Sequence, residues 1–253
     1  MRLKDKVAVV TGAGSGYGEG IAKAFCAQGC KIAILDLDLP AAERVANEIN
    51  ALQGADVALP IRCDLSNAAD IAAAVERTVE AYGGLDIAVS NAGVSQLPKS
   101  AMKVTAEEMD HTFAVNTKAI LYMAQCAIPE FRKRGGGALL TIASTAAIRP
   151  RPGMAAYNSS KFAAVGLSKT LALELARHSV RVNVICPVAG ETPMIDKYMT
   201  GDPVQNRQML IDTIPMGRLA QPADIAAAAL YLVEDGSSFV TGAVLEVDGG
   251  RSI

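Results

Sequence analysis

The sequence predicts an α/β protein of one domain, built on a doubly wound parallel sheet of about seven strands. Short β-branched or aliphatic runs alternate with amphipathic segments of helical length along the 253 residues, and no repeat or linker interrupts them. Strands separated by helices need crossover connections, which are right-handed and produce a parallel sheet covered on both faces. Apolar residues make up 51% of the chain and charged residues 20%, which is typical of a globular domain.

The expected elements follow one another in strict alternation. We expect strands at residues 6–11, 31–35, 57–63, 85–90, 137–143, 180–187 and 243–247. Helices are expected at residues 16–28, 41–53, 69–82, 116–134, 157–177 and 222–233. Gly29 and Gly54 follow the first two helices, where glycine commonly ends a helix. Ligands of doubly wound sheets bind beyond the carboxyl ends of the strands, so candidate site residues are sought there.

Composition argues against several classes of function. The net charge of −2 and pI near 5.8 give no overall attraction to nucleic acid or to an anionic membrane surface. No segment approaches the ~20 apolar residues of a membrane span, and the first apolar run is too short for a signal peptide, so a cytoplasmic protein is expected. The five cysteines form no Cys-x-x-Cys pair and only His111 and His178 accompany them, so no metal site is expected.

A glycine-rich loop follows the first expected strand. The sequence Thr-Gly-Ala-Gly-Ser-Gly-Tyr-Gly at residues 11–18 opens the first expected helix. Glycine permits a tight turn and lets a pyrophosphate approach the free N–H groups of a helix N-terminus. The order strand, loop, helix therefore predicts a Rossmann-type dinucleotide site that includes Gly12, Ser15, Gly16, Tyr17 and Gly18.

The end of the second expected strand indicates which dinucleotide is bound. Asp36 lies 18 residues after Gly18, where a carboxylate accepts hydrogen bonds from ribose hydroxyls and repels a 2′-phosphate. Ser15 in the loop offers no cation to such a phosphate, so both residues favour NAD over NADP. Asp38 is a competing candidate for this role, and the alternative is an aspartate that merely caps a turn. After the fourth strand, Asn91, Ala92 and Gly93 suit a position where a cofactor presses on the backbone.

Tyr157 and Lys161 are the candidate proton-transfer pair. They are four residues apart on an expected helix and so share one face. An ammonium group beside a phenol favours phenolate, so we expect the pKa of Tyr157 to fall from ~10 towards neutrality. Ser144, just past the fifth strand, is placed to orient a substrate oxygen, and Asn116 at the start of the long helix is placed to hold a water in a proton relay.

These motifs, taken together, resemble those of the short-chain dehydrogenase/reductase family over nearly the whole chain. The marks are Thr11-Gly12-x-x-x-Gly16-x-Gly18, Asp64, Asn91-Ala92-Gly93, Asn116, Ser144 and Tyr157-x-x-x-Lys161. The resemblance implies that Tyr157 exchanges the proton, that Lys161 lowers its pKa and holds the nicotinamide ribose, and that Ser144 steadies the substrate oxygen. It also implies that Asn116 connects the relay to water. Asp64 and the backbone of Leu65 would contact the adenine.

The family pattern is altered at two positions. Pro187 and Thr192 of the segment after the sixth strand are kept and would contact the nicotinamide end, but Val188 replaces the usual glycine. Tyr17 replaces a more common aliphatic residue. In the family, the stretch at about 188–216 is a lid over the substrate, and four of the nine methionines fall within it. They favour a partly apolar substrate, or else pack the lid helices on the body of the protein.

The resemblance implies an NAD(H)-dependent oxidoreductase that transfers a hydride between the nicotinamide and a secondary alcohol or ketone. Reduction of 3-oxoacyl thioesters is the alternative within the family, and a non-catalytic NAD(H)-binding sensor or scaffold is the alternative of another class. Arg149 and Arg151, between Ser144 and Tyr157, are candidates to bind an acidic group of the substrate, or else are loop charges. A homotetramer is expected, as is common in the family.

Overall fold

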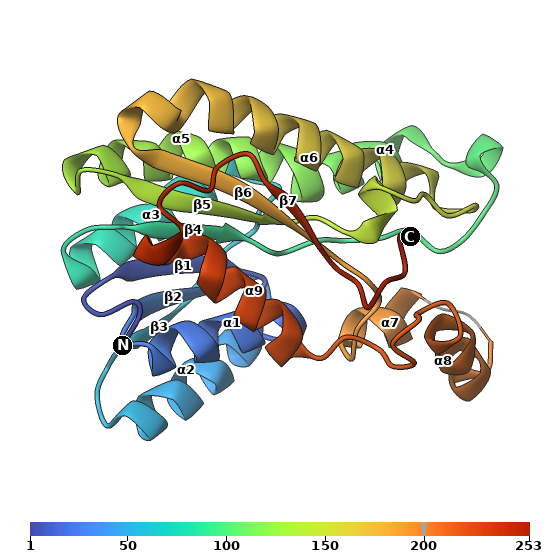
Figure 1. The fold of residues 1–253 in the computed structure, drawn as a ribbon, viewed down its shortest axis with the longest axis horizontal. Coiled ribbons are helices and arrows are strands. Elements are labelled where there is room, and N and C mark those ends of the chain that lie inside the picture. The colour runs from blue at the N-terminus through green and yellow to red at the C-terminus, as the bar shows by residue number, and fades with distance from the viewer. Residues whose placement is uncertain (199–200) are drawn as a thin grey trace.

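The computed structural model, which describes residues 1–198 and 201–253, contains one parallel sheet of seven strands (Figure 1). The order across the sheet is β3-β2-β1-β4-β5-β6-β7. The strands are β1 (Val7–Thr11), β2 (Lys31–Asp36), β3 (Ala58–Arg62), β4 (Ile87–Ser90), β5 (Gly137–Ile142), β6 (Val180–Pro187) and β7 (Val244–Val247). The chain builds outward from β1 in one direction and then, from β4, in the other. The topological switch point therefore lies between β1 and β4, as a doubly wound sheet requires.

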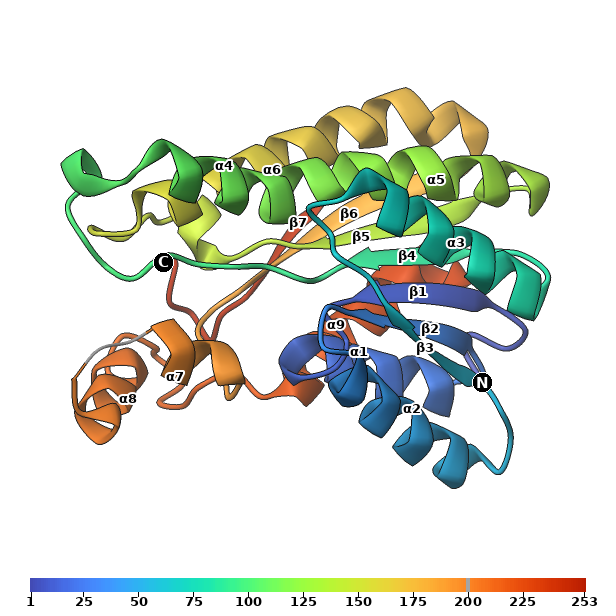
Figure 2. The same cartoon turned by 180° about the vertical axis from the view of Figure 1, so that it is seen from behind.

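Helices cover both faces of this sheet (Figure 1 and Figure 2). One face carries α1 (Gly16–Ala27), α2 (Leu39–Gln53) and α9 (Pro222–Val233). The other carries α3 (Ala68–Tyr82), α5 (Ala119–Lys133) and α6 (Ala155–Leu175), with α4 (Ala106–Phe113) against α6. Within the described ranges no helix is both long and apolar enough to cross a membrane.

The two apolar cores follow from alternation along the strands. In β1, Ala8 and Val10 face the core that contains Phe25 of α1. Val7 and Val9 face the opposite core, which contains Phe131 of α5. All five side chains of β1 are buried, because a strand in the middle of a parallel sheet is covered on both faces. This rigid centre fixes the carboxyl ends of β1 and β4, where the glycine-rich loop and Asn91 begin.

The helix expected at residues 116–134 has a more complex start than the sequence predicts. A π-helical turn at Ala114–Lys118 joins α4 to α5 (Ala119–Lys133). The helix α4 itself was not expected, although Thr105 and Glu108 form a capping box at its start. That pattern was the available signal for α4. The π-helical turn places Asn116 inside the protein and away from the outer face of the helix.

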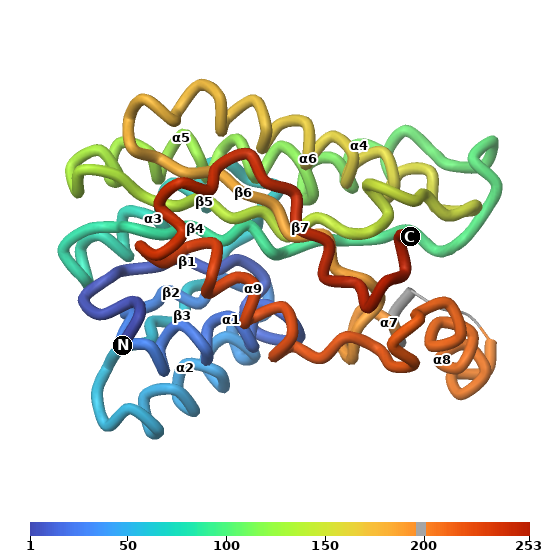
Figure 3. Tube along the Cα trace, viewed as in Figure 1, coloured from blue at the N-terminus to red at the C-terminus, as the bar shows by residue number. Residues whose placement is uncertain are grey.

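Two further short helices, α7 (Pro193–Tyr198) and α8 (Pro203–Ile211), project from the end of the sheet where the strands finish (Figure 1). Figure 3 shows the chain after β7 returning to this same end. The backbone N–H of Met216 donates to the carbonyl of Gly249 at 3.1 Å and so joins the two segments. Short 3₁₀ turns occur at Ala101–Lys103, Thr145–Ala147, Ala176–His178 and Asp235–Ser237.

Candidate active site

A cleft of about 790 Å³ opens at the carboxyl ends of the strands, between the sheet and the α7–α8 segment. Its walls contain most of the residues singled out in the sequence. These are Gly12, Ser15, Gly16, Tyr17, Asp36, Asp64, Leu65, Asn91, Ala92, Gly93, Ser144, Tyr157, Lys161, Pro187 and Thr192. Gly18 and Asn116 are the two predicted site residues that do not line it. The fold thus brings residues from six strand ends to one continuous surface.

The glycine-rich loop needs glycine for two separate reasons. Gly12 has φ +61° and Gly16 has φ +57°, a region that residues with a side chain seldom adopt. Gly18 is required for space, because a Cβ on it would lie 2.2 Å from the carbonyl oxygen of Gly12. Gly18 was predicted to contact the cofactor directly. In the structure it does not line the cleft and instead packs against the backbone of the loop at Gly12.

The amide of Asn91 braces this loop. Its Nδ2 donates to the carbonyls of Thr11 and Gly12, at 2.8 and 3.1 Å. The Thr11 hydroxyl accepts from the backbone N–H of Asn91 at 2.9 Å and of Ala92 at 3.1 Å. Thr11 and Asn91 thus lock the end of β1 to the end of β4, and the Asn91 amide is directed at backbone and not at the cleft.

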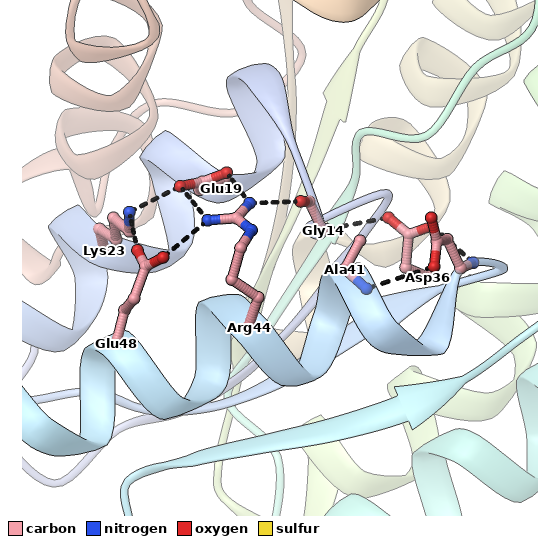
Figure 4. Close-up of polar contacts among 8 residues, drawn as sticks. Gly14, Glu19, Lys23, Asp36, Ala41, Arg44 and Glu48 are labelled. Atoms are coloured by element: carbon pink, nitrogen blue, oxygen red, sulfur yellow. Dashed lines mark hydrogen bonds and ion pairs between the residues drawn. The ribbon is translucent and has the colours of Figure 1, made fainter.

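Asp36 is held at the far end of the glycine-rich loop (Figure 4). Its Oδ2 accepts from the backbone N–H of Gly14 at 2.9 Å, and its Oδ1 accepts from the N–H of Asp38 at 3.0 Å. Asp38 does not line the cleft; its carboxylate caps α2 by accepting from the N–H of Ala41 at 3.2 Å. Of the two competing aspartates, Asp36 alone faces the cleft among the described residues.

Arg44 on α2 lies beside this loop and was not singled out in the sequence. Its guanidinium donates to the carbonyl of Gly14 at 3.0 Å and pairs with Glu19 at 2.7 Å and Glu48 at 2.9 Å (Figure 4). Lys23 bridges the same two carboxylates at 2.6 and 2.7 Å. The charge of Arg44 is therefore balanced by carboxylates.

Asp64 and Leu65 form the next part of the wall, beyond β3. The Asp64 carboxylate accepts from the backbone N–H of Ser66 at 2.9 Å and from its hydroxyl at 2.7 Å. These hydrogen bonds lower the pKa of Asp64, so it is ionised at neutral pH. Among the described residues, no hydrogen-bond donor contacts its other carboxylate oxygen.

Tyr157 lies at the opposite end of the cleft, on the first turn of α6. Burial raises the pKa of Tyr157, while its hydrogen bond with Ser144 and the positive charge of Arg151 act in the opposite direction. The predicted fall in this pKa is therefore wrong, because removal of the phenol from water outweighs the nearby groups. At neutral pH Tyr157 is a protonated phenol, suited to donate a proton to an oxygen beside Ser144.

Lys161 lies one helical turn from Tyr157, with its Nζ 5.8 Å from the centre of the phenol ring. Nζ donates to the carbonyl of Ile142 at 3.1 Å. Burial lowers the pKa of Lys161 to about 8, since a buried ammonium loses its hydration. Lys161 thus remains mostly protonated at pH 7 and faces the cleft with its remaining donors.

Asn116 lies behind the cleft, in the π-helical turn. Its Oδ1 accepts from the N–H of Val94 at 2.8 Å, and its Nδ2 donates to the carbonyl of Val94 at 2.9 Å and to Ser160 Oγ at 2.9 Å. The side chain is 2% exposed. Asn116 therefore joins the segment after β4 to α6. Its contact on α6 is Ser160, the residue before Lys161.

Gln96 was not singled out in the sequence and contacts the backbone at Tyr157. The side chain is 5% exposed, and its Oε1 accepts from the N–H groups of Ala156 at 2.8 Å and Tyr157 at 3.3 Å. Its Nε2 donates to the carbonyl of Gly153 at 3.3 Å. Gln96 accepts from two N–H groups in the first turn of α6 that have no partner within the helix. It thereby fixes the position of the turn that carries Tyr157. It lies in an irregular segment with no pattern that would have revealed it.

The two altered family positions are coupled in space. The Tyr17 hydroxyl donates to the carbonyl of Val188 at 3.0 Å, which ties α1 to the segment after β6. A Cβ on Gly190 would lie 1.8 Å from this hydroxyl oxygen, so glycine at 190 makes room for the tyrosine. The unusual Tyr17 thereby fastens Val188, the residue that replaces the usual glycine.

Comparison with known proteins agrees with this geometry. Residues 12–252 match the family model described as enoyl-(acyl carrier protein) reductase. The chain is 43% identical to the 4-formylbenzenesulfonate dehydrogenase of Comamonas testosteroni, over all of both chains. It is 38% identical to the D-threitol dehydrogenase of Mycolicibacterium smegmatis, over 100% of this chain and 95% of the relative.

A solved structure is also similar to this chain in both sequence and fold. The 3-ketoacyl-(acyl-carrier-protein) reductase from Brucella melitensis, crystallised with NADH, is 45% identical with a TM-score of 0.92, over 99% of this chain and 100% of the other. Extensive sequence identity and the same fold along the whole chain accompany the Tyr157-Lys161 arrangement and the glycine-rich loop. The protein therefore belongs to the short-chain dehydrogenase/reductase family.

Proposed function

We propose that this protein is an NAD(H)-dependent oxidoreductase that interconverts a secondary alcohol and its ketone. The observation that carries the proposal is one cleft with a dinucleotide cradle at one end and the Ser144, Tyr157 and Lys161 group at the other. A binding protein needs the first end but has no need of a buried proton donor. A sensor or scaffold would have no use for the Ser144, Tyr157 and Lys161 group.

The residues of the cleft fit a dinucleotide. Gly12 and Gly16 adopt the positive φ of the turn at the start of α1, where backbone N–H groups attract a pyrophosphate. Asp36 would accept from the adenosine ribose, and Asp64 with the Leu65 backbone would contact the adenine. Pro187 and Thr192 would contact the nicotinamide end, with Lys161 donating to its ribose. When bound, the cofactor supplies the acceptor or donor of the hydride.

Asp36 and Arg44 favour NAD over NADP. The carboxylate of Asp36 would repel a 2′-phosphate at the position it occupies. Arg44, whose charge would otherwise attract that phosphate, is paired with Glu19 and Glu48. The NADH complex of the Brucella melitensis relative supports the same choice.

The chemistry of the chain's own residues is proton transfer and charge stabilisation. In the reducing direction Tyr157 donates its proton to the carbonyl oxygen, on which negative charge develops as the hydride arrives. Ser144 donates a hydrogen bond to the same oxygen, a contact that strengthens in the transition state. Lys161 assists the phenolate form of Tyr157 by its positive charge. Asn116 would link Lys161 to a water relay.

Reduction of a 3-oxoacyl thioester is the second candidate, because the Brucella melitensis relative bears that name. The D-threitol dehydrogenase relative favours oxidation of a small alcohol. The carrier substrate of the thioester reaction is acidic, and the net charge of −2 offers it no general attraction.

The stretch 188–216 is proposed as a substrate lid on the single domain 1–253. It contributes Met194, Ile195 and Leu210 to the cleft. Glu191 and Arg207, both within this stretch, form an ion pair. Of its other methionines, Met209 and Met216 are exposed, and Met199 lies outside the described residues. Met194 alone of the three described methionines in this stretch thus supports an apolar substrate pocket.

We further propose a homotetramer located in the cytoplasm. Exposed apolar side chains include Phe162 and Leu173 on α6, and Tyr231, Phe239 and Leu245 on or between α9 and β7. A tetramer of paired dimers requires two self-complementary faces, and these two regions are the candidates. The five cysteines are all free thiols, as in a reducing compartment. Light scattering should give four times the chain mass of 26.3 kDa, and a mass of one chain would contradict the assembly.

Initial rates at 340 nm with a panel of secondary, aryl and polyol alcohols, each with NAD and with NADP, test the activity. We expect turnover that is at least roughly a hundredfold faster with NAD, as a repelled 2′-phosphate would produce. Acetoacetyl thioester with NADH serves as the competing substrate. Faster turnover of the thioester than of every alcohol and ketone would favour the second candidate, and binding of NADH without any turnover would favour a sensor.

A further inference from the structure

Arg151 is a half-buried cation in the wall of the cleft, close to Tyr157. It lies in the loop between the Thr145–Ala147 turn and α6, and its positive charge acts on the Tyr157 phenol. The loop backbone is held in place, since Asn158 Nδ2 donates to the Arg151 carbonyl at 2.8 Å. The position of Arg151 relative to Tyr157 is therefore fixed by the start of α6.

The guanidinium of Arg151 makes no hydrogen bond or ion pair within the described part of the chain. Arg181 shows what a half-buried arginine in this protein otherwise does, since it donates to the carbonyls of Leu232 at 2.6 Å and Val233 at 3.0 Å. Arg134 is paired with Asp86 at 3.1 Å. A half-buried charge without a partner is unfavourable, so Arg151 is a residue whose partner is expected to come from a ligand.

No described carboxylate near Arg151 balances its charge. The acidic residues that line the cleft are Asp36 and Asp64, both at the glycine-rich end, within the described residues. Arg251 lies near Arg151 and, after burial, further lowers its pKa, which adds positive charge to this side. Asp248, close to Arg251 in sequence, accepts from the N–H groups of Gly250 and Ser252 at 2.9 and 2.8 Å.

Apolar side chains also line the cleft that Arg151 faces. Pro152 and Met154 are close to Arg151 in the chain, and Pro98, Met194, Ile195 and Leu210 line the same cleft. A ligand that fits both features has an apolar body and one anionic group. Guanidinium binds the two oxygens of a carboxylate or sulfonate through parallel N–H donors.

We propose that Arg151 selects substrates that carry a carboxylate or sulfonate, separated by an apolar framework from the alcohol or ketone that reacts at Tyr157. This proposal rests on the proposed function, because it assumes that the reacting oxygen lies between Ser144 and Tyr157. The expected substrates are aromatic or aliphatic secondary alcohols that bear an organic oxyanion. A neutral pocket would reject such substrates.

The test compares matched ketones in a complex that cannot react. The full-length enzyme is saturated with NAD, and the dissociation constants of acetophenone, 4-acetylbenzoate, 4-acetylbenzenesulfonate and the methyl ester of 4-acetylbenzoate are measured by calorimetry. Since ketone and oxidised cofactor exchange no hydride, binding is measured apart from turnover. The variants are Arg151→Gln and Arg151→Lys, with Arg149→Gln as the control, because the Arg149 guanidinium donates to the carbonyl of Arg251 at 3.0 Å.

We expect the wild type to bind the two anions roughly ten- to a hundredfold more tightly than the neutral ketones, as a charge-assisted bidentate contact provides. Arg151→Gln should abolish this ratio, Arg151→Lys should restore part of it for the carboxylate, and Arg149→Gln should preserve it. Equal binding of charged and neutral ketones, binding of none, or an unchanged ratio in Arg151→Gln overturns the proposal.

Turnover of the corresponding alcohols separates this failure from failure of the proposed function. Oxidation of 1-phenylethanol with an unchanged anion ratio in Arg151→Gln would remove the role of Arg151 and leave the dehydrogenase. A large ratio that depends on Arg151, with no oxidation of any alcohol by NAD, would keep the anion site and overturn the activity.

Discussion

The two ends of the cleft are constructed differently. At the cofactor end, the Asn91 amide donates to the carbonyl of Gly12, 79 residues earlier, and the Asp36 carboxylate accepts from the N–H of Gly14, 22 residues earlier. At the substrate end, Gln96 accepts from the N–H of Tyr157, 61 residues later, and the carbonyl of Val188 accepts from the hydroxyl of Tyr17, 171 residues earlier. Both ends thus depend on partners far apart in the chain, but those at the cofactor end lie in motifs that follow strand ends, whereas Gln96 lies in an irregular segment.

The largest effect on cofactor binding should come from Gly18→Val, which tests how rigid the cofactor end is. A Cβ there would lie 2.2 Å from the Gly12 carbonyl oxygen and 2.5 Å from Asn91 Nδ2, so the loop must move. Displacement by about 1 Å should weaken NADH binding by roughly a hundredfold, as measured by fluorescence titration. Gly54→Ala is the control, because φ is +64° there but no atom lies within 4 Å. Retention of NADH affinity in Gly18→Val would show that the cofactor end is adaptable.

Gln96→Leu should impair the substrate end of the cleft and leave cofactor binding nearly unchanged. It removes the acceptor for the N–H groups of Ala156 and Tyr157 and should lower kcat by roughly tenfold or more, in line with leaving buried donors unpaired. The dissociation constant for NADH should change little, since Gln96 is remote from the glycine-rich loop. Gln96→Glu keeps an acceptor oxygen and should recover most of kcat. Equal losses of NADH affinity and of kcat in Gln96→Leu would mean that the ends are not independent.

The pair Tyr17 and Gly190 tests the link between α1 and the segment after β6. Gly190→Ala places a Cβ 1.8 Å from the Tyr17 hydroxyl oxygen, and overpacking of this kind destabilises by about 1–3 kcal/mol. Adding Tyr17→Leu should recover part of the loss in melting temperature, although the Ala220 carbonyl, 2.7 Å from the new Cβ, still limits the fit. A double variant no more stable than Gly190→Ala would show that the hydroxyl is not the obstacle.

The smallest expected effect is on pH dependence. Because the pKa of Tyr157 is raised, reduction of acetophenone should be insensitive to pH near neutrality and decline in alkaline solution, where the phenol loses its proton. Oxidation of 1-phenylethanol needs the phenolate and should rise with pH over the same range. Arg151→Gln removes a charge that lowers this pKa, so the midpoint should move to higher pH by about one unit or less. A shift to lower pH would contradict the electrostatic role of Arg151.

The part of the fold that could be predicted is the part whose signals are local. The glycine-rich loop, Asp36 and the Tyr157–Lys161 pair each occur within a few residues of a strand end or along one helical turn. Gln96 gave no such signal, because its partners Ala156 and Tyr157 belong to another segment of the chain. Arg44 has one local partner, Glu48, but its contacts with Gly14 and Glu19 are made to another segment. The direction of the Tyr157 pKa was wrong for a related reason, since burial depends on the whole surrounding structure and not on the neighbouring Lys161.

Tyr157→Phe tests the central claim most directly, because it removes one hydroxyl at the substrate end and leaves the cofactor end unchanged. We expect oxidation of the best alcohol by NAD to fall by roughly 10²–10⁴-fold, the usual contribution of a positioned proton donor. The dissociation constant for NADH should stay within about threefold, since a hydroxyl that is not part of the glycine-rich loop adds little to cofactor binding. Turnover within a few-fold of the wild type would show that Tyr157 does not transfer the proton, and would contradict the proposed mechanism.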